Sequence, residues 1–407
     1  MSFSQQARQH LERVVLPFWL DNGIDDQFGG FFTAFDNRGR SRLSTDKFTW
    51  SQGRFVWLLA RAARLARAGQ IEADPDELLS FATAGAEFLI THAVLADGTT
   101  RFVVGRDGGR PESSGQPDRS IYADWFVVMG LYELARETSE SRWIDAATPV
   151  LNRSQEDHLS GTAPTPPYKV PKGHHAFGPR LILTNTLLVA AQAAAALGYQ
   201  EEQTRQQLRS ALEEMLSHRQ PDGTFSEMPG PDKRSLVSRH RVPGHAIEAN
   251  WIALESLDFL EDSRSRLPLL ESLTASCELG WDPEYGGLLR YTDSSGPVKP
   301  SGREFGTDYE KLVAETWSSK LWWVHSEASA ATAIAKARHN YEPAGKWFEK
   351  IWHYTLDTFP AGSEGEEWVQ IRDRNGDPLD RVVALPVKDP FHIIRNLMQM
   401  VELEQFD

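Results

Sequence analysis

The connections between the predicted helices of this 407-residue chain alternate between short and long. Apolar residues recur at helical spacing in segments at roughly residues 3–20, 47–69, 75–93, 119–138, 140–157, 180–198, 200–217, 243–261, 265–278, 311–336, 341–357 and 388–404. Short turns such as Glu137–Ser139 follow the even-numbered segments. Long loops follow the odd-numbered ones, at residues 21–46, 94–118, 158–179, 218–242, 279–310 and 358–387. This alternation is typical of a chain that repeats a helical hairpin.

The long loops also resemble one another in sequence. Asp25–Phe32 recurs as Asp282–Leu289, with an acidic residue followed by Gly-Gly and two apolar residues. Glycine pairs beside alternating apolar residues predict a short β-hairpin in such a loop, here at Phe31–Gly39 and Leu288–Gly296. Six helical hairpins of this kind close into an all-α (α/α)6 barrel, with the even-numbered helices inside. No Pro/Ser-rich linker interrupts the pattern, so residues 1–407 are predicted to form a single domain.

In the predicted barrel, the candidate catalytic and binding residues lie at one end. All inner helices run in the same direction, so their N-termini meet the long loops on one face, where loops supply binding and catalytic groups. Polar side chains that are costly to bury do lie at the starts of the even-numbered helices. They are Lys47, Trp50, Gln52, Arg54, Tyr122, Asp124, Arg180, Asn185, His245, Glu248, Lys320, Trp322, His325, Glu327, Lys388 and His392.

One helix start stands out among these. Pro243 marks the entrance of a helix that is apolar on almost every side, which predicts that the helix is buried. His245 and Glu248 are three residues apart and therefore share one face of its first turn. Taken alone, this stretch is equally compatible with a buried His–Glu pair whose hydrogen bonds are made within the core and with a functional site.

Composition narrows the classes of partner. The net charge of −14 argues against nucleic acid and anionic membranes, which attract basic patches. The single cysteine, Cys277, excludes an intramolecular disulfide framework and fits a reducing compartment. Met1–His10 is polar and no stretch reaches the length of a membrane span, so a cytoplasmic protein is expected. The thirteen tryptophans suit a cleft that faces carbohydrate.

Several motifs together resemble the N-acylglucosamine 2-epimerase family. They are Asp25–Phe32, Asp46–Trp57, the Pro-Gly-His-x-x-Glu-Ala stretch at Pro243–Ala249, the Lys-Leu-Trp-Trp-x-His-x-Glu stretch at Lys320–Glu327, and Phe391–His392. The resemblance runs in order over nearly the whole chain and implies the (α/α)6 barrel. Leu181–Asn185 resembles the apolar run of the N-acylglucosamine branch. No histidine lies between Arg180 and Leu197, where the isomerase branches place one.

The resemblance implies an isomerase that acts at C2 of an open-chain hexose, most closely an N-acyl-D-glucosamine 2-epimerase. It assigns His245 and His392 as the acid–base pair, Glu248 as the support of His245, and Arg54 as the group that holds the sugar oxygens. An imidazole titrates near neutrality and can take and return the C2 proton, while a guanidinium stabilises the negative charge that develops on O1. The expected substrate-binding residues are Trp50, Tyr122, Asp124, Asn185, Trp322, His325 and Glu327.

These assignments also bear on cofactors and partners. Charge stabilisation by Arg54 and the imidazoles leads us to expect that the chemistry needs no metal and no cofactor. The sequence has no P-loop pattern. The resemblance nevertheless leaves a nucleotide effector open, because some N-acylglucosamine epimerases need one. The expected partner is a small sugar, and a homodimer is left open.

Other readings remain open at this stage. A mannose–glucose type aldose–ketose isomerase, or a 2-epimerase of an unsubstituted hexose, would use the same barrel. A metal enzyme could use His245 and Glu248 as two ligands of one ion. An inverting glycoside hydrolase would need two carboxylates across the cleft, and a non-catalytic binding protein would need none. The candidate carboxylates for a hydrolase are Asp124, Glu248, Glu315 and Glu327.

Overall fold

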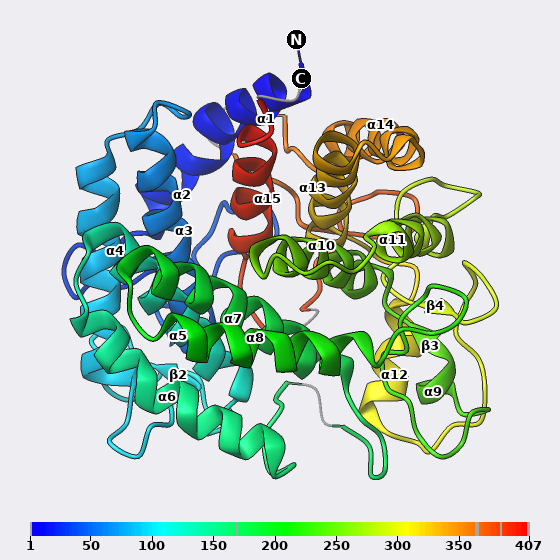
Figure 1. The fold of residues 1–407 in the computed structure, drawn as a ribbon, viewed down its shortest axis with the longest axis horizontal. Helices are drawn as coiled ribbons and strands as arrows, with labels where there is room; N and C mark the ends of the chain where they lie inside the picture. The colour runs from blue at the N-terminus through cyan, green and yellow to red at the C-terminus, as the bar shows by residue number, and fades with distance from the viewer. Residues whose placement is uncertain (1, 168–169, 363–365, 383–384, 405–407) are drawn as a thin grey trace.

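Two concentric layers of helices make up the protein (Figure 1). The computed structural model describes residues 2–167, 170–362, 366–382 and 385–404. The inner layer consists of α3 (Thr49–Arg67), α5 (Ile121–Thr138), α7 (Phe177–Leu197), α10 (Pro243–Phe259), α13 (Trp322–His339) and α15 (Phe391–Val401). The outer layer consists of α1 (Phe3–His10) with η1 (Leu11–Val15) and α2 (Leu16–Gly23), α4 (Pro75–Phe88) with η2 (Leu89–Ala93), α6 (Arg142–Leu159), α8 (Glu201–Leu216), α11 (Leu267–Gly280) and α14 (Glu342–Thr358). The predicted (α/α)6 barrel is confirmed.

The inner helices form a closed ring, and most of their residues are buried. Each contacts the next in chain order, and α15 returns to α3. On α5 every residue from Ile121 to Ala135 is buried. Gly53 and Gly130 lie where α3 crosses α5, and a Cβ at Gly53 would come within 2.4 Å of the backbone of Phe126. Close backbone contact at this crossing therefore requires glycine.

One inner helix has the length and composition of a membrane span. It is α7, whose apolar window is 72% buried inside the barrel. It packs against α5, α8 and α10. Its hydrophobicity is explained by its place in the core.

Three short strand pairs tie the long loops together. β1 (Lys47–Phe48) pairs with β2 (Val103–Val104), β3 (His240–Arg241) with β4 (Thr292–Asp293), and β5 (Lys320–Leu321) with β6 (Ile371–Arg372), all antiparallel. Each pair joins the segment before an inner helix to the next long loop. This arrangement differs from the hairpins expected within single loops at Phe31–Gly39 and Leu288–Gly296. There the chain closes only through isolated bridges such as Phe35 with Arg42 and Asp293 with Gly296.

Two of the strand pairs carry the same buried ion pair. Lys47 Nζ donates to Asp25 Oδ2 at 2.9 Å, and Lys320 Nζ donates to Asp282 Oδ2 at 3.1 Å. Each lysine also donates to a backbone carbonyl of the neighbouring Gly-Gly turn. All four side chains are 0% exposed. The recurring Asp-x-x-x-Gly-Gly pattern is thus the acceptor half of a lysine clamp, which fixes a long loop to the start of an inner helix. We refer to these two ion pairs as the lysine clamps.

The predicted helix at 311–336 is wrong as a single element. The structure has α12 (Asp308–Thr316), then β5, then α13. Lys320 and Leu321 are extended because they pair with β6 and because the Lys320 ammonium reaches Asp282. Tertiary contacts override a helical pattern that is continuous in the sequence.

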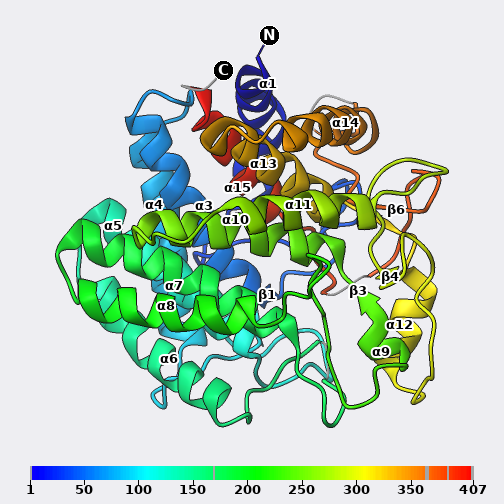
Figure 2. The same ribbon diagram turned by 45° about the vertical axis from the view of Figure 1, so that its right-hand side comes forward.

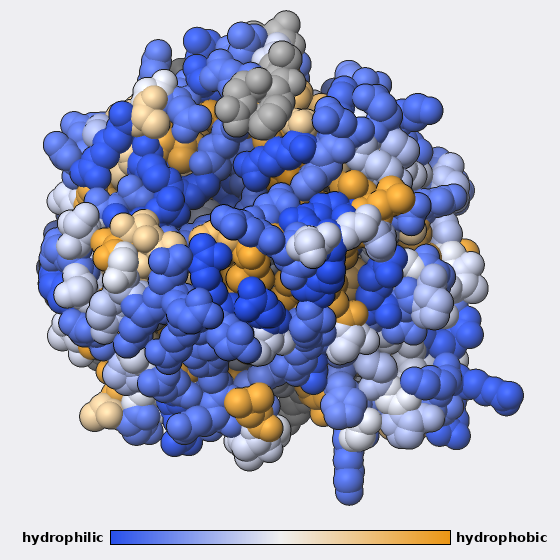
Figure 3. Space-filling model, viewed as in Figure 1, coloured by the Kyte–Doolittle hydropathy of each residue, from blue (hydrophilic) through white to orange (hydrophobic). Residues whose placement is uncertain are grey.

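The end of the barrel with the long loops carries two short additional helices. α9 (Leu236–Arg239) and α12 lie beside β3 and β4 on one side of the molecule, as Figure 2 shows. The face seen in Figure 3 is mostly hydrophilic, and its apolar side chains occur in small separate groups.

Candidate active site

A cavity opens at the loop end of the barrel, where the inner helices begin. All six inner helices and several loops contribute to it. Its lining comprises Trp50, Ser51, Arg54, Tyr122, Ala176, Gly178, Leu181, Ile182, Glu227, Met228, Val242, His245, Glu248, Arg290, Tyr291, Tyr309, Leu321, Trp322, Trp323, Leu385, Val387, Asp389 and His392. The cavity therefore lies where the sequence placed the functional face.

Two histidines reach this cavity from different helices. His245 stands in the first turn of α10, and His392 stands in the first turn of α15. Both imidazole rings pack on the indole of Trp323, with centroid distances of 5.2 Å for His245 and 5.6 Å for His392. Trp323 thus contacts both titratable rings and restrains them at the cavity.

A carboxylate that the sequence analysis did not identify holds His245. Nδ1 of His245 lies 3.0 Å from Oε2 of Glu227, a buried residue in the loop before α10. Burial lowers the pKa of His245, but the charge and hydrogen bond of Glu227, with a smaller contribution from Glu248, outweigh it and raise the pKa. The expected support by Glu248 is therefore wrong in its main part, because the hydrogen bond comes from Glu227.

Replacement of Glu227 by Gln should shift the pH dependence of catalysis. The amide can keep the hydrogen bond to Nδ1 but removes the charge, so burial dominates and the pKa of His245 falls. The limb of the kcat/KM profile that reports His245 should move to lower pH, with turnover retained at the new optimum. Glu284→Gln, at a partly exposed loop carboxylate outside the cavity, is the control. An unchanged profile in Glu227→Gln would contradict the charge coupling.

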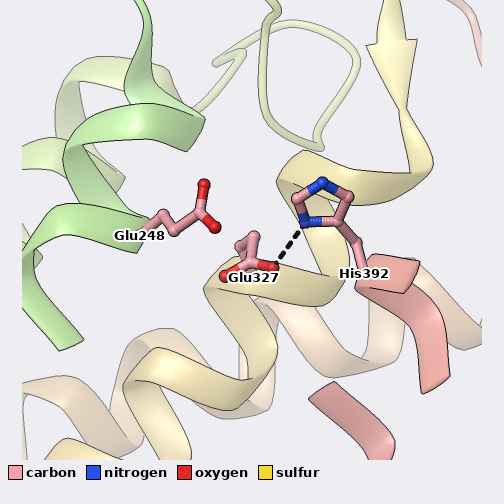
Figure 4. Close-up of side chains that lie close together, drawn as sticks. All are labelled: Glu248, Glu327 and His392. Carbon is pink, nitrogen blue, oxygen red and sulfur yellow. Dashed lines mark hydrogen bonds and ion pairs between the residues drawn. The ribbon is translucent and has the colours of Figure 1, made fainter. Parts of the chain in front are cut away.

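His392 rests on a buried network beneath the cavity. Its Nδ1 lies 2.8 Å from Oε1 of Glu327, and Figure 4 shows Glu248, Glu327 and His392 converging from α10, α13 and α15. Arg395 Nη2 donates to Oε1 of Glu248 at 2.6 Å and also to Glu327. Asn396 Nδ2 donates to the same Oε1 of Glu327 at 2.7 Å. With Nδ1 directed at Glu327, the Nε2 of His392 is the ring nitrogen available to a ligand.

The same carboxylates make up a candidate metal-binding group. Ligand atoms of Glu248, Glu327 and His392 lie within 4.8 Å of one another. Arg395 already supplies a cation to both carboxylates. A metal ion would have to displace that guanidinium, so the geometry favours the arginine as the counter-charge. The alternative site at His245 and Glu248 is not favoured either, because Nδ1 of His245 faces Glu227.

Arg54 reaches the cavity from α3. Its guanidinium packs over Phe126 and Phe391 at 4.1 and 4.6 Å from the ring centroids. Nη1 lies 3.4 Å from Oδ2 of Asp389. Burial lowers the pKa of Arg54 to about 10, with the charge of Asp389 opposing that effect. Arg54 therefore remains a cation at neutral pH.

Comparison with known proteins identifies the family of this chain. The family model described as N-acylglucosamine 2-epimerase matches residues 30–395. The chain belongs to the N-acylglucosamine 2-epimerase family. The mouse protein named N-acylglucosamine 2-epimerase is 29% identical over 97% of this chain and 90% of its own length.

Solved structures show the same fold. The cellobiose 2-epimerase of Bacillus thermoamylovorans superposes with a TM-score of 0.73 at 20% identity, covering 98% of this chain and 99% of that one. A D-mannose isomerase superposes with a TM-score of 0.74 at 17% identity, covering 99% of both chains. Members of the N-acylglucosamine 2-epimerase family convert sugars, and this chain is an enzyme of that isomerase class.

Within this family fold, seven of the eleven expected site residues line the cavity. They are Trp50, Arg54, Tyr122, His245, Glu248, Trp322 and His392. Trp50 and Tyr122 contact each other there, with ring centroids 5.2 Å apart.

The other four expected residues lie outside the cavity lining. Asp124 accepts hydrogen bonds from Thr100 and Arg119 and ties the start of α5 to a loop. Asn185 lies deeper in the barrel, beside a second, smaller cavity. Glu327 is buried, and its Oε1 lies 2.8 Å from Nδ1 of His392. Contact of these residues with the substrate stays a prediction that the cavity lining does not support.

His325 is the fourth such residue, and its surroundings are those of a structural group. Its Nε2 accepts from the backbone N–H of Leu288 at 2.8 Å, and its Nδ1 lies 2.8 Å from the carbonyl of Leu321. Burial lowers the pKa of His325 to about 3, so the ring is neutral. Gln52 plays a similar part in the first clamped loop, where its Oε1 accepts from the N–H of Phe31 at 2.7 Å and its Nε2 donates to the carbonyl of Phe31.

Residues of the site that escaped the sequence analysis include Glu227, Arg290, Trp323, Asp389 and Arg395. Arg395 could have been found, because it follows His392 by one helical turn and shares its face. Asp389 could have been found from its place just before that helix. Glu227 carries no comparable signal, because a long loop of irregular course brings it to His245.

The geometry also weighs against the glycoside hydrolase alternative. Asp124 and Glu327 lie outside the cavity lining, and Glu315 on α12 is held by Arg381. Of the four candidate carboxylates only Glu248 lines the cavity, and Arg395 holds it. The expected pair of opposed carboxylates does not form among them.

Proposed function

We propose that this enzyme interconverts N-acyl-D-glucosamine and N-acyl-D-mannosamine by moving the proton at C2 of the open-chain sugar. The observation that carries the proposal is the placement of His245 and His392 on a common indole, each backed by its own buried carboxylate. Two acid–base groups can serve the two faces of C2, as an epimerase requires.

The proposed reaction proceeds through an enolate of the open-chain sugar, because C2 of the substrate carries an N-acylamino group. One imidazole removes the C2 hydrogen as a proton, and the electron pair moves into the C1–C2 bond while negative charge develops on O1. Arg54 offers its donors to that oxygen. The other imidazole then delivers a proton to the opposite face of C2. Because burial of Arg54 among aromatic rings reduces its screening by water, its charge acts strongly on the oxyanion.

An apolar wall of the cavity supports an N-acylated substrate. Ala176, Met228 and Val242 belong to a small hydrophobic cluster that lies beside the main core, and all three line the cavity. Leu181 and Ile182 of α7 add to it. An acetyl methyl group would be buried against this wall, whereas the hydroxyl of an unsubstituted hexose would gain nothing there.

We also propose that the chemistry uses no metal or organic cofactor. The charge that stabilises the enolate would come from Arg54, which lines the cavity, while Arg395 balances the buried carboxylates Glu248 and Glu327. A nucleotide effector would act away from the reacting atoms. A cytoplasmic location and a homodimer remain proposals of the same kind.

One experiment tests the function. Chelator-treated enzyme is incubated in deuterated water with N-acetylglucosamine, N-acetylmannosamine, glucose and mannose, with and without ATP, and followed by NMR. We expect deuterium at C2 of both N-acetylhexosamines together with their interconversion, at a rate unchanged by chelation. The reason is that the proton taken from C2 by a side chain when the enolate forms exchanges with solvent before it returns.

Each other outcome has a definite meaning. A ketose product, or exchange only in free hexoses, would favour the aldose–ketose isomerase alternative. Activity that disappears on chelation and returns with one divalent ion would overturn the metal-free mechanism. Exchange into none of the sugars would contradict the proposed function.

A further inference from the structure

Chemistry at C2 needs an open-chain sugar, but a hexose in water is almost entirely closed into a ring. Opening the ring moves a proton from the anomeric hydroxyl O1 to the ring oxygen O5, while the C1–O5 bond breaks and the C1–O1 bond becomes a carbonyl. A general acid–base group beside C1 would accelerate this step. The two histidines and Arg54 already have roles in the proton transfer at C2.

The cavity contains a carboxylate that these roles do not use. Asp389 lines the cavity just before α15. Its Oδ2 lies 3.4 Å from Nη1 of Arg54 and 4.0 Å from Nε2 of His392. It is therefore next to the group proposed to hold O1 and next to the ring nitrogen that faces the substrate.

The backbone of Asp389 is held on both sides by the side-chain amide of Gln370. Its N–H donates to Oε1 of Gln370 at 2.9 Å, and its carbonyl accepts from Nε2 of Gln370 at 2.9 Å. The amide of Gln370 also bonds Glu367, which forms an ion pair with Lys388 at 2.7 Å. These buried contacts fix the backbone of Asp389, and the N–H of Phe391, 3.4 Å from Oδ1, restrains the carboxylate itself, as preorganised catalysis requires.

The other cavity carboxylates are committed elsewhere. Glu227 bonds Nδ1 of His245 at 3.0 Å, and Glu248 bonds Arg395 at 2.6 Å. The Asp389–Arg54 contact of 3.4 Å is long for a hydrogen bond, and a sugar hydroxyl could enter beside it.

We propose that Asp389 is the catalytic residue for ring opening and closure, and hence that the enzyme also interconverts the α and β anomers of its substrate. The Asp389 carboxylate takes the proton from O1–H as the O1 electron pair forms the carbonyl and the C1–O5 bond breaks. The same carboxyl group then gives that proton to O5. Atoms and charge balance, and the carboxylate is regenerated without a further reactant.

This inference rests on the proposed function, because it uses the same cavity and the same sugar. The test follows mutarotation of pure α-N-acetylglucosamine by polarimetry, corrected for the spontaneous rate. Wild-type enzyme should accelerate mutarotation, and Asp389→Asn should lose that acceleration by at least about a hundredfold. Asp389→Glu should recover part of it, and Asp377→Asn, at an exposed carboxylate in the same long loop, should behave as wild type.

A second measurement separates chemistry from structural damage. In Asp389→Asn, net epimerisation should stop rising with enzyme concentration once spontaneous ring opening becomes limiting. In the wild type it should remain proportional to enzyme concentration. A variant that is only misshapen would keep the proportionality at a lower slope.

The two hypotheses can fail separately. Mutarotation at the wild-type rate in Asp389→Asn, or no acceleration by the wild type, overturns the role of Asp389 while epimerisation can still be observed. Loss of mutarotation in Asp389→Asn, with no C2 exchange by the wild type, supports the ring-opening step but overturns the proposed function. His392→Asn is the reference variant, and it should still accelerate mutarotation after epimerisation is lost.

Discussion

Replacement of His392 by Asn should lower net epimerisation by about a hundred- to ten-thousand-fold, the usual contribution of a general acid–base group. Asn is similar in shape and can still bond Glu327, but it has no basic nitrogen to face the sugar. The fold should survive, since Arg395 and Asn396 continue to hold Glu327. Steady-state rates in both directions, with circular dichroism as the check on folding, measure the effect.

The same replacement at His245 tests the two-histidine mechanism more directly. His245→Asn should lose net turnover to a similar extent, because each imidazole serves one face of C2. If each histidine serves one face, one variant should still exchange deuterium into C2 of one epimer without forming the other. Near-normal turnover of every accepted sugar in both variants would mean that the two-histidine mechanism is wrong.

Replacement of Arg395 by Met should destabilise the protein by about 3–5 kcal/mol, the usual result of removing one partner from a buried ion pair. Arg395 is 1% exposed and bonds both Glu248 and Glu327. Without it, two carboxylates remain in the core without their cation. Urea unfolding at neutral pH measures the loss, read from the shift of the midpoint.

The pH dependence of this effect has a definite sign. Burial raises the pKa of Glu327, but Arg395 and His392 outweigh it and hold the pKa below the ordinary value of 4.5. In the wild type this carboxylate therefore stabilises the fold above that value, and the stabilisation is lost as the pH falls through the lower pKa. In Arg395→Met the pKa should rise, so the deficit relative to wild type should shrink as the pH falls toward 4.5.

A compensated variant provides the control. Arg395→Met combined with Glu248→Gln and Glu327→Gln removes all three charges, and should be more stable at neutral pH than Arg395→Met alone. If the single and triple variants unfold at the same urea concentration, the loss comes from packing and not from uncompensated charge.

The sequence was sufficient for the barrel because the ring of helices follows from local patterns. Apolar periodicity marks the helices, and the lengths of the connections mark which helices lie inside. It was not sufficient at residues 311–336, where the Lys320–Asp282 contact makes the chain extended within a helical pattern. Contacts between distant loops, such as β5 with β6, leave no periodic signal.

The candidate site was predictable where its residues lie on inner helices. His245 and His392 occupy first turns, and the barrel geometry brings first turns together. The sequence does not distinguish polar residues that line the cavity from polar residues that hold the backbone. Asp124 and His325 share the positional pattern of the site residues, but their hydrogen bonds go to loops. Only the three-dimensional structure distinguishes these two groups of residues.

The residues of the two lysine clamps, which shape the rim of the cavity, are different from the residues that would recognise a ligand. They fix the long loops through Asp25, Lys47, Asp282 and Lys320, and none of these four side chains lines the cavity. Substitutions at Ile182 on α7 or at Met228, which line the cavity outside the clamps, could therefore alter which molecule is accepted without loosening the clamped loops. Such a scaffold can acquire new specificities in evolution through single substitutions in the cavity, since these do not require compensating changes in the lysine clamps.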